Sequence, residues 1–243
     1  MSAISYLHLL MLRQNNSMTR HNQTLFNLPL FNQHQFNPPQ LNQVAIDQLQ
    51  QGQAKRLSLL WLWLQQDETR LAALMVCQKV MQQQGITDWL ISAGFIRNLI
   101  WDNLHSMTSQ PLNDIDVIYW RDNNPSSAED QAIEALLVKQ IALPWSVKNQ
   151  ARMHLRNGDM PYISCADAMS FWPEKQTAIG VKLASIDDLT SAEFQLQVTS
   201  VFGLSCLFDL SLSPNPKRDK AIFNHRVSQK GWLIHYSKLL VTE

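Results

Sequence analysis

The chain has 243 residues, of which 45% are hydrophobic, and its 20 acidic residues balance 20 Lys and Arg, with a pI near 7.1. This length suits one substantial α/β domain, alone or with a small appendage. The neutral charge argues against a surface that binds nucleic acid throughout, although a local basic groove is compatible with it. No run is long enough to cross a membrane, and the three cysteines are too far apart for a disulfide framework or a zinc motif, so we expect a cytoplasmic protein.

The N-terminal part of the chain is poor in periodic apolar residues. Asn and Gln dominate residues 13–53, and such a tract buries too little apolar surface to offset the entropy of ordering. We therefore expect residues 1–53 to form a disordered polar tail, with an aggregation-prone or partner-binding arm built on the repeated Phe-Asn pairs as the alternative. The apolar stretch at 1–11 lacks the basic residues and the cleavage site of a signal peptide.

Residues 54–243 are predicted to form the folded domain. Leu57–Leu64 is apolar and rich in Trp, and Asp67 is placed to cap a following helix that ends at Gly85. The spacing of the apolar residues in both segments is helical. We expect these two helices to pack on one face of a sheet.

The stretch Leu90–Trp120 predicts a strand, a glycine turn, a helix and a second strand. The first strand is interrupted at Ala93-Gly94, where a tight turn or the close approach of a ligand requires a missing side chain. The period becomes helical from Phe95. A loop rich in Pro, Asn and Asp then leads into Ile115–Tyr119, which is typical of a buried strand.

Asp114 and Asp116 stand at the entrance of this second strand. Residues two apart in a strand point to the same side, so the sequence predicts two carboxylates side by side. Paired carboxylates repel each other unless a cation lies between them, and oxygen ligands suit Mg²⁺ (or Mn²⁺). Asp114 and Asp116 are therefore the predicted metal ligands and catalytic residues.

Gly94 and Arg97 are the predicted phosphate-binding residues. Gly94 lets a phosphate approach the N-terminus of the helix, and Arg97, one turn later, offers a two-pronged donor to it. Each pattern alone also occurs in ordinary turns, but their order and spacing together predict a site. A metal site beside a phosphate site is the minimum requirement for transfer of a nucleotidyl group from a nucleoside triphosphate (NTP).

The motif AGFIRN…NDIDV resembles the signature of the polymerase-beta-type nucleotidyltransferase superfamily and the head of tRNA-nucleotidyltransferase-like proteins. Over roughly the last two-thirds of the chain, WSVKNQARMHLRNG and ISCADAMSFWPEKQTAIGV resemble a family of bacterial nucleotidyltransferase-like proteins. The resemblance implies an α/β (α+β) fold, a mixed sheet flanked by helices, with an NTP as substrate. It leaves the acceptor and the base open.

The superfamily generally has a third acidic residue in addition to the two that correspond to Asp114 and Asp116, and this chain departs from the superfamily at that position. The superfamily carries this acid on a later strand, which we expect here at Pro144–Met153, and that segment contains no Asp or Glu. Asn149 or Gln150 is expected at the corresponding position, or Asp159 reaches back from the following turn. Because an amide is no general base, the rival interpretation is a non-catalytic nucleotide-binding or RNA-associated module.

Basic residues follow at two places. Lys148 and Arg152 are predicted to contact phosphate, with a solvated surface as the alternative. The tail from Pro214 is basic as well, and is interpreted either as a patch facing triphosphate or nucleic acid or as an amphipathic helix that docks on the core. For the aromatic Trp232 and Tyr236 we favour a place in the core over stacking on a base.

Two further strands are expected before this tail. Ala178–Leu183 and Phe194–Ser200 alternate apolar and polar residues. Asp187 and Asp188 lie in the turn between them and form a second possible acid pair. We favour a solvated loop for this pair, because it lies in a turn.

Overall fold

The computed structural model describes residues 43–122, 126–184 and 195–242. The chain divides into two units, one up to Lys55 and one from Arg56 to Glu243, and helix α2 (Gln43–Gln66) runs through the boundary. The folded part was predicted to begin near residue 54, but the helix already begins at Gln43. The rest of the predicted tail lies outside the described residues.

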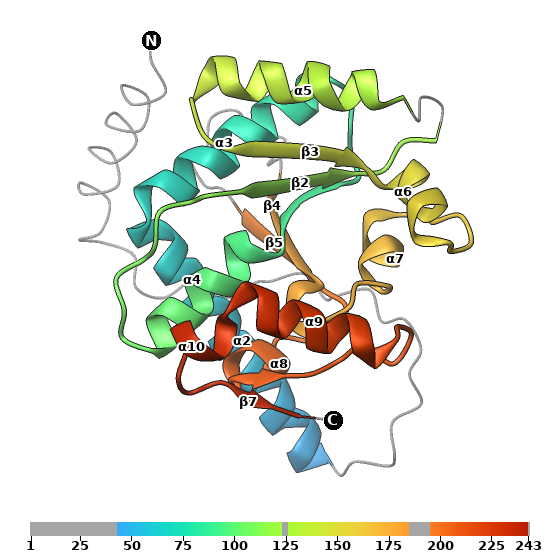
Figure 1. The fold of residues 1–243 in the computed structure, drawn as a ribbon. Helices are drawn as coiled ribbons and strands as arrows, with labels where there is room; N and C mark the ends of the chain where they lie inside the picture. The colour runs from blue at the N-terminus through green and yellow to red at the C-terminus, as the bar shows by residue number, and fades with distance from the viewer. Residues whose placement is uncertain (1–42, 123–125, 185–194, 243) are drawn as a thin grey trace, which may run out of the picture. The chain divides into compact units, whose positions relative to one another are not determined.

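The second unit is built on a mixed five-stranded sheet in the order β3-β2-β1-β4-β5 (Figure 1). β2 and β3 are parallel, and the other neighbours are antiparallel. The strands are β1 (Trp89–Ser92), β2 (Ile115–Tyr119), β3 (Trp145–Asn149), β4 (Ile179–Ala184) and β5 (Gln195–Ser200). The predicted mixed sheet is thus confirmed.

Helices and short segments connect and cover these strands. The helices are α3 (Glu68–Gln83), α4 (Gly94–Leu104), α5 (Ser127–Gln140), α6 (Gln150–Asn157), α7 (Cys165–Met169), the 3₁₀ turn η1 (Lys175–Thr177), α8 (Ser205–Phe208), α9 (Lys220–Lys230) and α10 (Trp232–His235). Two short strands, β6 (Ser211–Leu212) and β7 (Leu240–Val241), pair in parallel. Among the described helices, none combines the length and the hydropathy needed to span a membrane.

Side-chain caps set the start of several helices. The Asp67 carboxylate accepts the N–H of Arg70 at the start of α3, as predicted, and the Ser126 hydroxyl accepts the N–H of Ala128 at the start of α5. The predicted strand Pro144–Met153 is wrong in its second half. The Asn149 amide oxygen accepts the N–H of Ala151, so the strand ends there and α6 begins.

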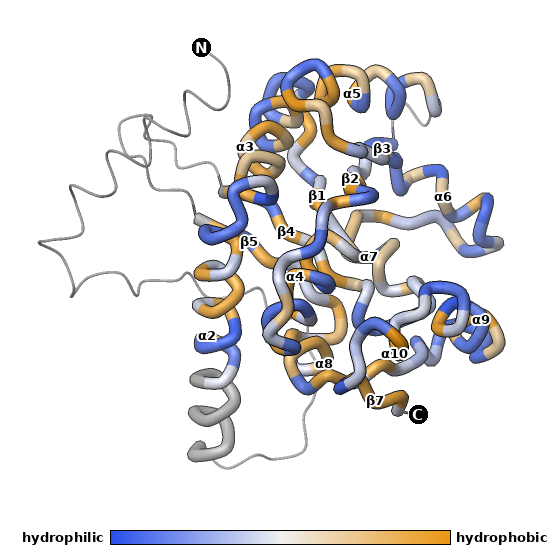
Figure 2. Tube along the Cα trace, turned by 60° about the vertical axis from the view of Figure 1, so that its left-hand side comes forward, coloured by the Kyte–Doolittle hydropathy of each residue, from blue (hydrophilic) through white to orange (hydrophobic). Residues whose placement is uncertain are grey.

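Helix α6 is a surface helix. Gln150 is its only buried residue, and Figure 2 shows it as mostly hydrophilic. The start of α6 is therefore set by the cap at Asn149 more than by an apolar face that packs on the core.

Hydrophobic residues are exposed in the short strand β7, as Figure 2 shows.

The two faces of the sheet are covered differently because side chains alternate along each strand. One face, which includes Ile91, Val117 and Val147, packs against α3, α4 and α5 in the larger core. On the other face, Leu90 and Ile118 pack against residues of α7. Asp116 and Ser92 belong to this second face, since each lies two positions along its strand from one of these residues.

Candidate active site

The turn between β1 and α4 holds the site in place. Ser92, fully buried at the end of β1, donates its hydroxyl to the carbonyl oxygen of Asp116 at 3.1 Å. The next residue, Ala93, has a positive φ of 53°, which is uncommon for a residue with a Cβ, and its N–H donates to the carbonyl of Ile179 at 2.9 Å. These two bonds place the start of α4 beside the aspartate strand.

The N-terminus of α4 offers free donors. Ala93, at the N-cap position, makes no side-chain bond to the helix. Within the part of the chain that the structure describes, no group accepts the N–H of Gly94 or of Phe95. Unpaired N–H groups at the positive end of a helix dipole favour an anion.

Arg97 is a buried cation on the first turn of α4. Its side chain is only 7% exposed, and its guanidinium carbon lies 5.2 Å from the Trp101 ring centroid and 4.6 Å from that of Trp232. Its Nε and Nη2 donate to the Asn98 amide oxygen at 3.1 and 2.8 Å. Among the described residues it forms no ion pair.

Burial lowers the pKa of Arg97 to about 10, although the charge of Glu174 opposes this shift. The group stays protonated at neutral pH, so a charge is buried without a direct carboxylate partner. Its Nη2 approaches the position that a Cβ on Gly94 would take, at 3.5 Å. The guanidinium therefore lies next to the free N–H groups of α4, where a bound anion would stabilise both.

The two predicted aspartates lie at the entrance of β2. Asp114 is exposed and Asp116 half-buried. Burial, together with the nearby charge of Asp114, raises the pKa of Asp116 to about 6, and the charge of Arg97 opposes this rise. Two carboxylates that disfavour each other's ionisation, one of them partly withdrawn from water, fit a divalent cation as their partner.

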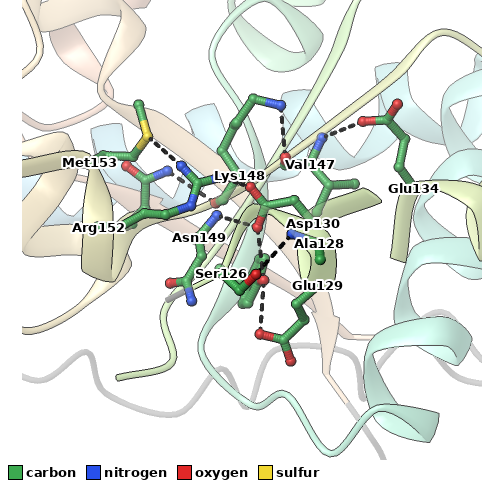
Figure 3. A network of polar contacts seen from close by, with 12 residues as sticks. Ser126, Ala128, Glu129, Asp130, Glu134, Val147, Lys148, Asn149, Arg152 and Met153 are labelled. Atoms are coloured by element: carbon green, nitrogen blue, oxygen red, sulfur yellow. Dashed lines mark hydrogen bonds and ion pairs between the residues drawn. The ribbon is translucent and has the colours of Figure 1, made fainter. Parts of the chain in front are cut away.

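Lys148 and Arg152 have different partners (Figure 3). Lys148 pairs with Ile118 on the face of the sheet that carries Asp116, and its charge opposes the rise in the pKa of that carboxyl. Its Nζ donates to the carbonyl of Val147 at 2.9 Å. Arg152 is bound to the buried carboxylate of Asp130, which also accepts the N–H of Asn149 at the other end of β2 and β3.

The structure thus brings Gly94, Arg97, Asp114, Asp116 and Lys148 to one edge of the sheet. Arg152 is not among them. Its predicted phosphate contact stays a prediction, and the ion pair with Asp130 does not favour it.

The candidates for the third acid are held elsewhere. Ser146 is the residue of β3 that pairs with Asp116. Asn149 caps α6, and the carboxylate of Asp159 is bound by Arg218 and by the Tyr162 hydroxyl. Within the described residues, no group of three or more acidic, His or Cys side chains is arranged to hold a metal ion.

Sequence reasoning missed two components of this region. Glu174 is fully buried, accepts a bond from the Thr177 hydroxyl at 3.1 Å and forms an ion pair with Arg226. Trp232 covers the guanidinium of Arg97 from the far end of the chain. No local pattern could have indicated these contacts, because the partners come from distant segments.

The remaining alternatives from the sequence have mixed outcomes. Trp232 and Tyr236 are buried at 5% and 3% exposure, which confirms their place in the core. Asp187 and Asp188 lie outside the described residues.

Several solved structures are similar to this chain. The solved structure of a CCA-adding enzyme head domain is similar to this chain with a TM-score of 0.57 and 26% identity, over 70% of this chain and 88% of that one. A CCA-adding enzyme in complex with CTP has a TM-score of 0.45 and 14% identity, over 73% of this chain and 41% of that one. A tRNA-processing enzyme complex has a TM-score of 0.45 and 11% identity, over 69% of this chain and 43% of that one.

None of the curated proteins matches the sequence. A family model described as nucleotidyltransferase matches residues 79–241, which contain the β1–α4 turn, the aspartate strand and the C-terminal helices. The chain therefore belongs to this nucleotidyltransferase family, which is of the polymerase-beta type.

Proposed function

We propose that this protein transfers a nucleoside monophosphate from an NTP to an acceptor and uses Mg²⁺ (or Mn²⁺) for the reaction. The observation that carries the proposal is the buried guanidinium of Arg97, which has no ion pair among the described residues and lies beside the free N–H groups of α4. The carboxylates of Asp114 and Asp116 lie at the same edge of the sheet. Membership in the family supports the class of reaction.

Each residue has a role that follows from its position. Asp114 and Asp116 would hold the divalent ion, which stabilises negative charge on the attacking and leaving oxygens. The N–H groups of Gly94 and Phe95 donate to phosphate oxygens, and Arg97 donates to them from the adjacent turn. The Gly94 and Phe95 N–H groups and the Arg97 guanidinium belong to a helix that packs on the core, so they bind phosphate without first having to rearrange.

A second candidate is nucleotide binding without turnover. It is favoured by Ser146, because this residue occupies the position on β3 that pairs with Asp116 and offers no carboxylate. The phosphate donors and the aspartate pair are common to both proposals. Only a measurement of turnover separates them.

The test is calorimetric binding of each of the four NTPs, with and without Mg²⁺, to the wild-type protein and to Asp114→Asn. We expect Mg²⁺-dependent binding by the wild type, and a loss of about tenfold or more in the variant because one ligand of the ion is gone. Asp122→Asn is the matched control, since this exposed residue follows the other end of β2. Asp114 is itself exposed, so neither substitution should change the thermal midpoint.

The outcomes separate the candidates. Mg²⁺-dependent binding with release of pyrophosphate in the presence of a suitable acceptor supports transfer, whereas binding without turnover supports the second candidate. Equal binding by wild type and Asp114→Asn, or no binding by the wild type, would contradict the assignment of the aspartate pair.

A further inference from the structure

We propose that Lys230, at the end of α9, binds the β- and γ-phosphates of the NTP, so that the site selects triphosphates over monophosphates. This inference rests on the proposed function and adds a residue from the C-terminal segment to the site. Three structural features support it: the anchoring of the corner between α9 and α10, the orientation of α9, and the free state of the Lys230 ammonium.

The corner between α9 and α10 is anchored on α4. Gly231 ends α9 with a φ of 63° in the left-handed region, and Trp232 directly follows. The Trp232 ring lies against the guanidinium of Arg97, and the Tyr236 hydroxyl donates to the buried carboxylate of Asp102 at 2.9 Å. Lys230 is therefore held two residues from a side chain that contacts the phosphate-binding arginine.

The orientation of α9 is fixed one turn earlier. Arg226 forms an ion pair with the buried Glu174, whose segment leads through η1 into β4. β4 pairs with β1 through Gly180 and Ser92, directly before the phosphate turn. Residues four apart lie on the same face of a helix, so Lys230 projects on the side of α9 that carries Arg226.

The Lys230 ammonium is free to meet a ligand. Lys230 is exposed, and among the described residues it makes no hydrogen bond and no ion pair. Other lysines near this region are already engaged, since Lys217 donates to the Ser170 hydroxyl and Lys238 to the carbonyl of Leu104.

The chemistry of the ligand suits this arrangement. Under the proposed function, the α-phosphate that is transferred would lie at the aspartates and the donors of α4, and the β- and γ-phosphates would then need another cation. A lysine on a long flexible stem can follow these phosphates as a compact point charge. A monophosphate lacks both of these phosphates, so its affinity should not fall when Lys230 is substituted.

The experiment compares Lys230→Met with Lys139→Met in the full-length protein. Lys139 is exposed near the end of α5, a helix that packs on the opposite face of the sheet. Its substitution removes the same positive charge as Lys230→Met, but away from the proposed site. Calorimetry with Mg²⁺ measures the Kd of the NTP that the wild type binds best and of the corresponding monophosphate. We expect Lys230→Met to raise the Kd of the NTP about five- to tenfold and that of the monophosphate less than twofold. Lys139→Met should change neither, and Lys230→Arg should retain most of the affinity.

Each result decides the inference. A selective loss for the triphosphate, with an unchanged thermal midpoint, supports it. Wild-type affinity for the NTP in Lys230→Met overturns it and leaves the proposed function standing. An equal loss for NTP and monophosphate overturns it as well, because the effect is then on the site in general. If the wild type binds no NTP, the proposed function fails and this inference fails with it.

Discussion

At the scale of single residues, the site contains charges that do not stabilise the ligand-free fold. Arg97 is buried without an ion pair among the described residues, whereas Arg226 pairs with the buried Glu174 and so offsets the cost of burying that carboxylate. Asp116 is half-buried beside the charge of Asp114. Unpaired buried charges of this kind cluster at functional sites, where the ligand supplies the missing partner.

Asp116→Asn should stabilise the metal-free protein at neutral pH. The folded-state pKa is about 6, above the ordinary value of 3.8, so the folded state holds a proton between these pH values that the unfolded state has lost. Stability contributed by this proton is present at low pH and is lost as the pH rises to about 6. The ionised group then costs on the order of 1–3 kcal/mol. We expect the variant to unfold about 3–8 °C higher than wild type at pH 7.5 in EDTA.

The same comparison at pH 4 should show almost no difference, because the carboxyl of Asp116 is then protonated in the folded protein. Mg²⁺ should raise the melting temperature of the wild type and leave that of Asp116→Asn unchanged. A variant less stable than wild type at pH 7.5 would show that the carboxylate has a stabilising partner instead.

At the scale of elements, the strand–turn–helix unit from Trp89 to Leu104 and the strand that follows form the site together. The strand β2 and the helix α4 could be predicted from local residues, since the apolar periods and the glycine turn are contained in the segment itself. The end of β3 at Asn149 could not be predicted from local residues. A strand and a helix compete there, and the cap decides in favour of the helix.

Gly94→Ala should preserve the fold and weaken phosphate binding. An added Cβ would lie 3.5 Å from Arg97 Nη2 and 3.7 Å from Asn98 Nδ2, which is ordinary contact, so we expect a stability change within about 0.5 kcal/mol. The methyl group would stand where the phosphate approaches, and the Kd of the NTP should rise about tenfold or more. Chemical denaturation and calorimetry measure the two effects.

Gly180→Ala provides the contrast on the neighbouring strand. Its Cβ would lie only 2.8 Å from the Cβ of Leu90, so the strands must shift and we expect a loss of about 1–3 kcal/mol. If Gly94→Ala instead destabilised the protein as strongly and left the affinity unchanged, Gly94 would be a structural glycine without a role in binding.

At the scale of the whole second unit, the C-terminal segment completes the region around Arg97. Trp232 stacks on the guanidinium, and Tyr236 bonds to Asp102 of α4. The sequence showed this segment as basic and left open whether it faces a ligand or packs on the core. In the structure its aromatic residues pack inward and its lysines lie at the surface, so both features are present in one segment.

Tyr236→Phe should destabilise the protein by about 1–3 kcal/mol, because it removes a donor from the fully buried Asp102 carboxylate. Ile234→Ala on the same short helix is the control, since this side chain is 91% exposed and should change stability little. Urea unfolding measures both. Equal midpoints for wild type and Tyr236→Phe would show that the anchor of α10 does not depend on this bond.

The sequence by itself determined the aspartate strand, the glycine turn and the arginine after it, because these features depend on residues that are neighbours in the chain. It also indicated the mixed sheet and the family. Only the tertiary structure decided that Arg97 lacks a carboxylate partner among the described residues, that Arg152 is occupied by Asp130, and that Trp232 covers the Arg97 guanidinium. Burial, pairing and shifted pKa values depend on groups brought together from distant segments, and such groups leave no local pattern in a single sequence.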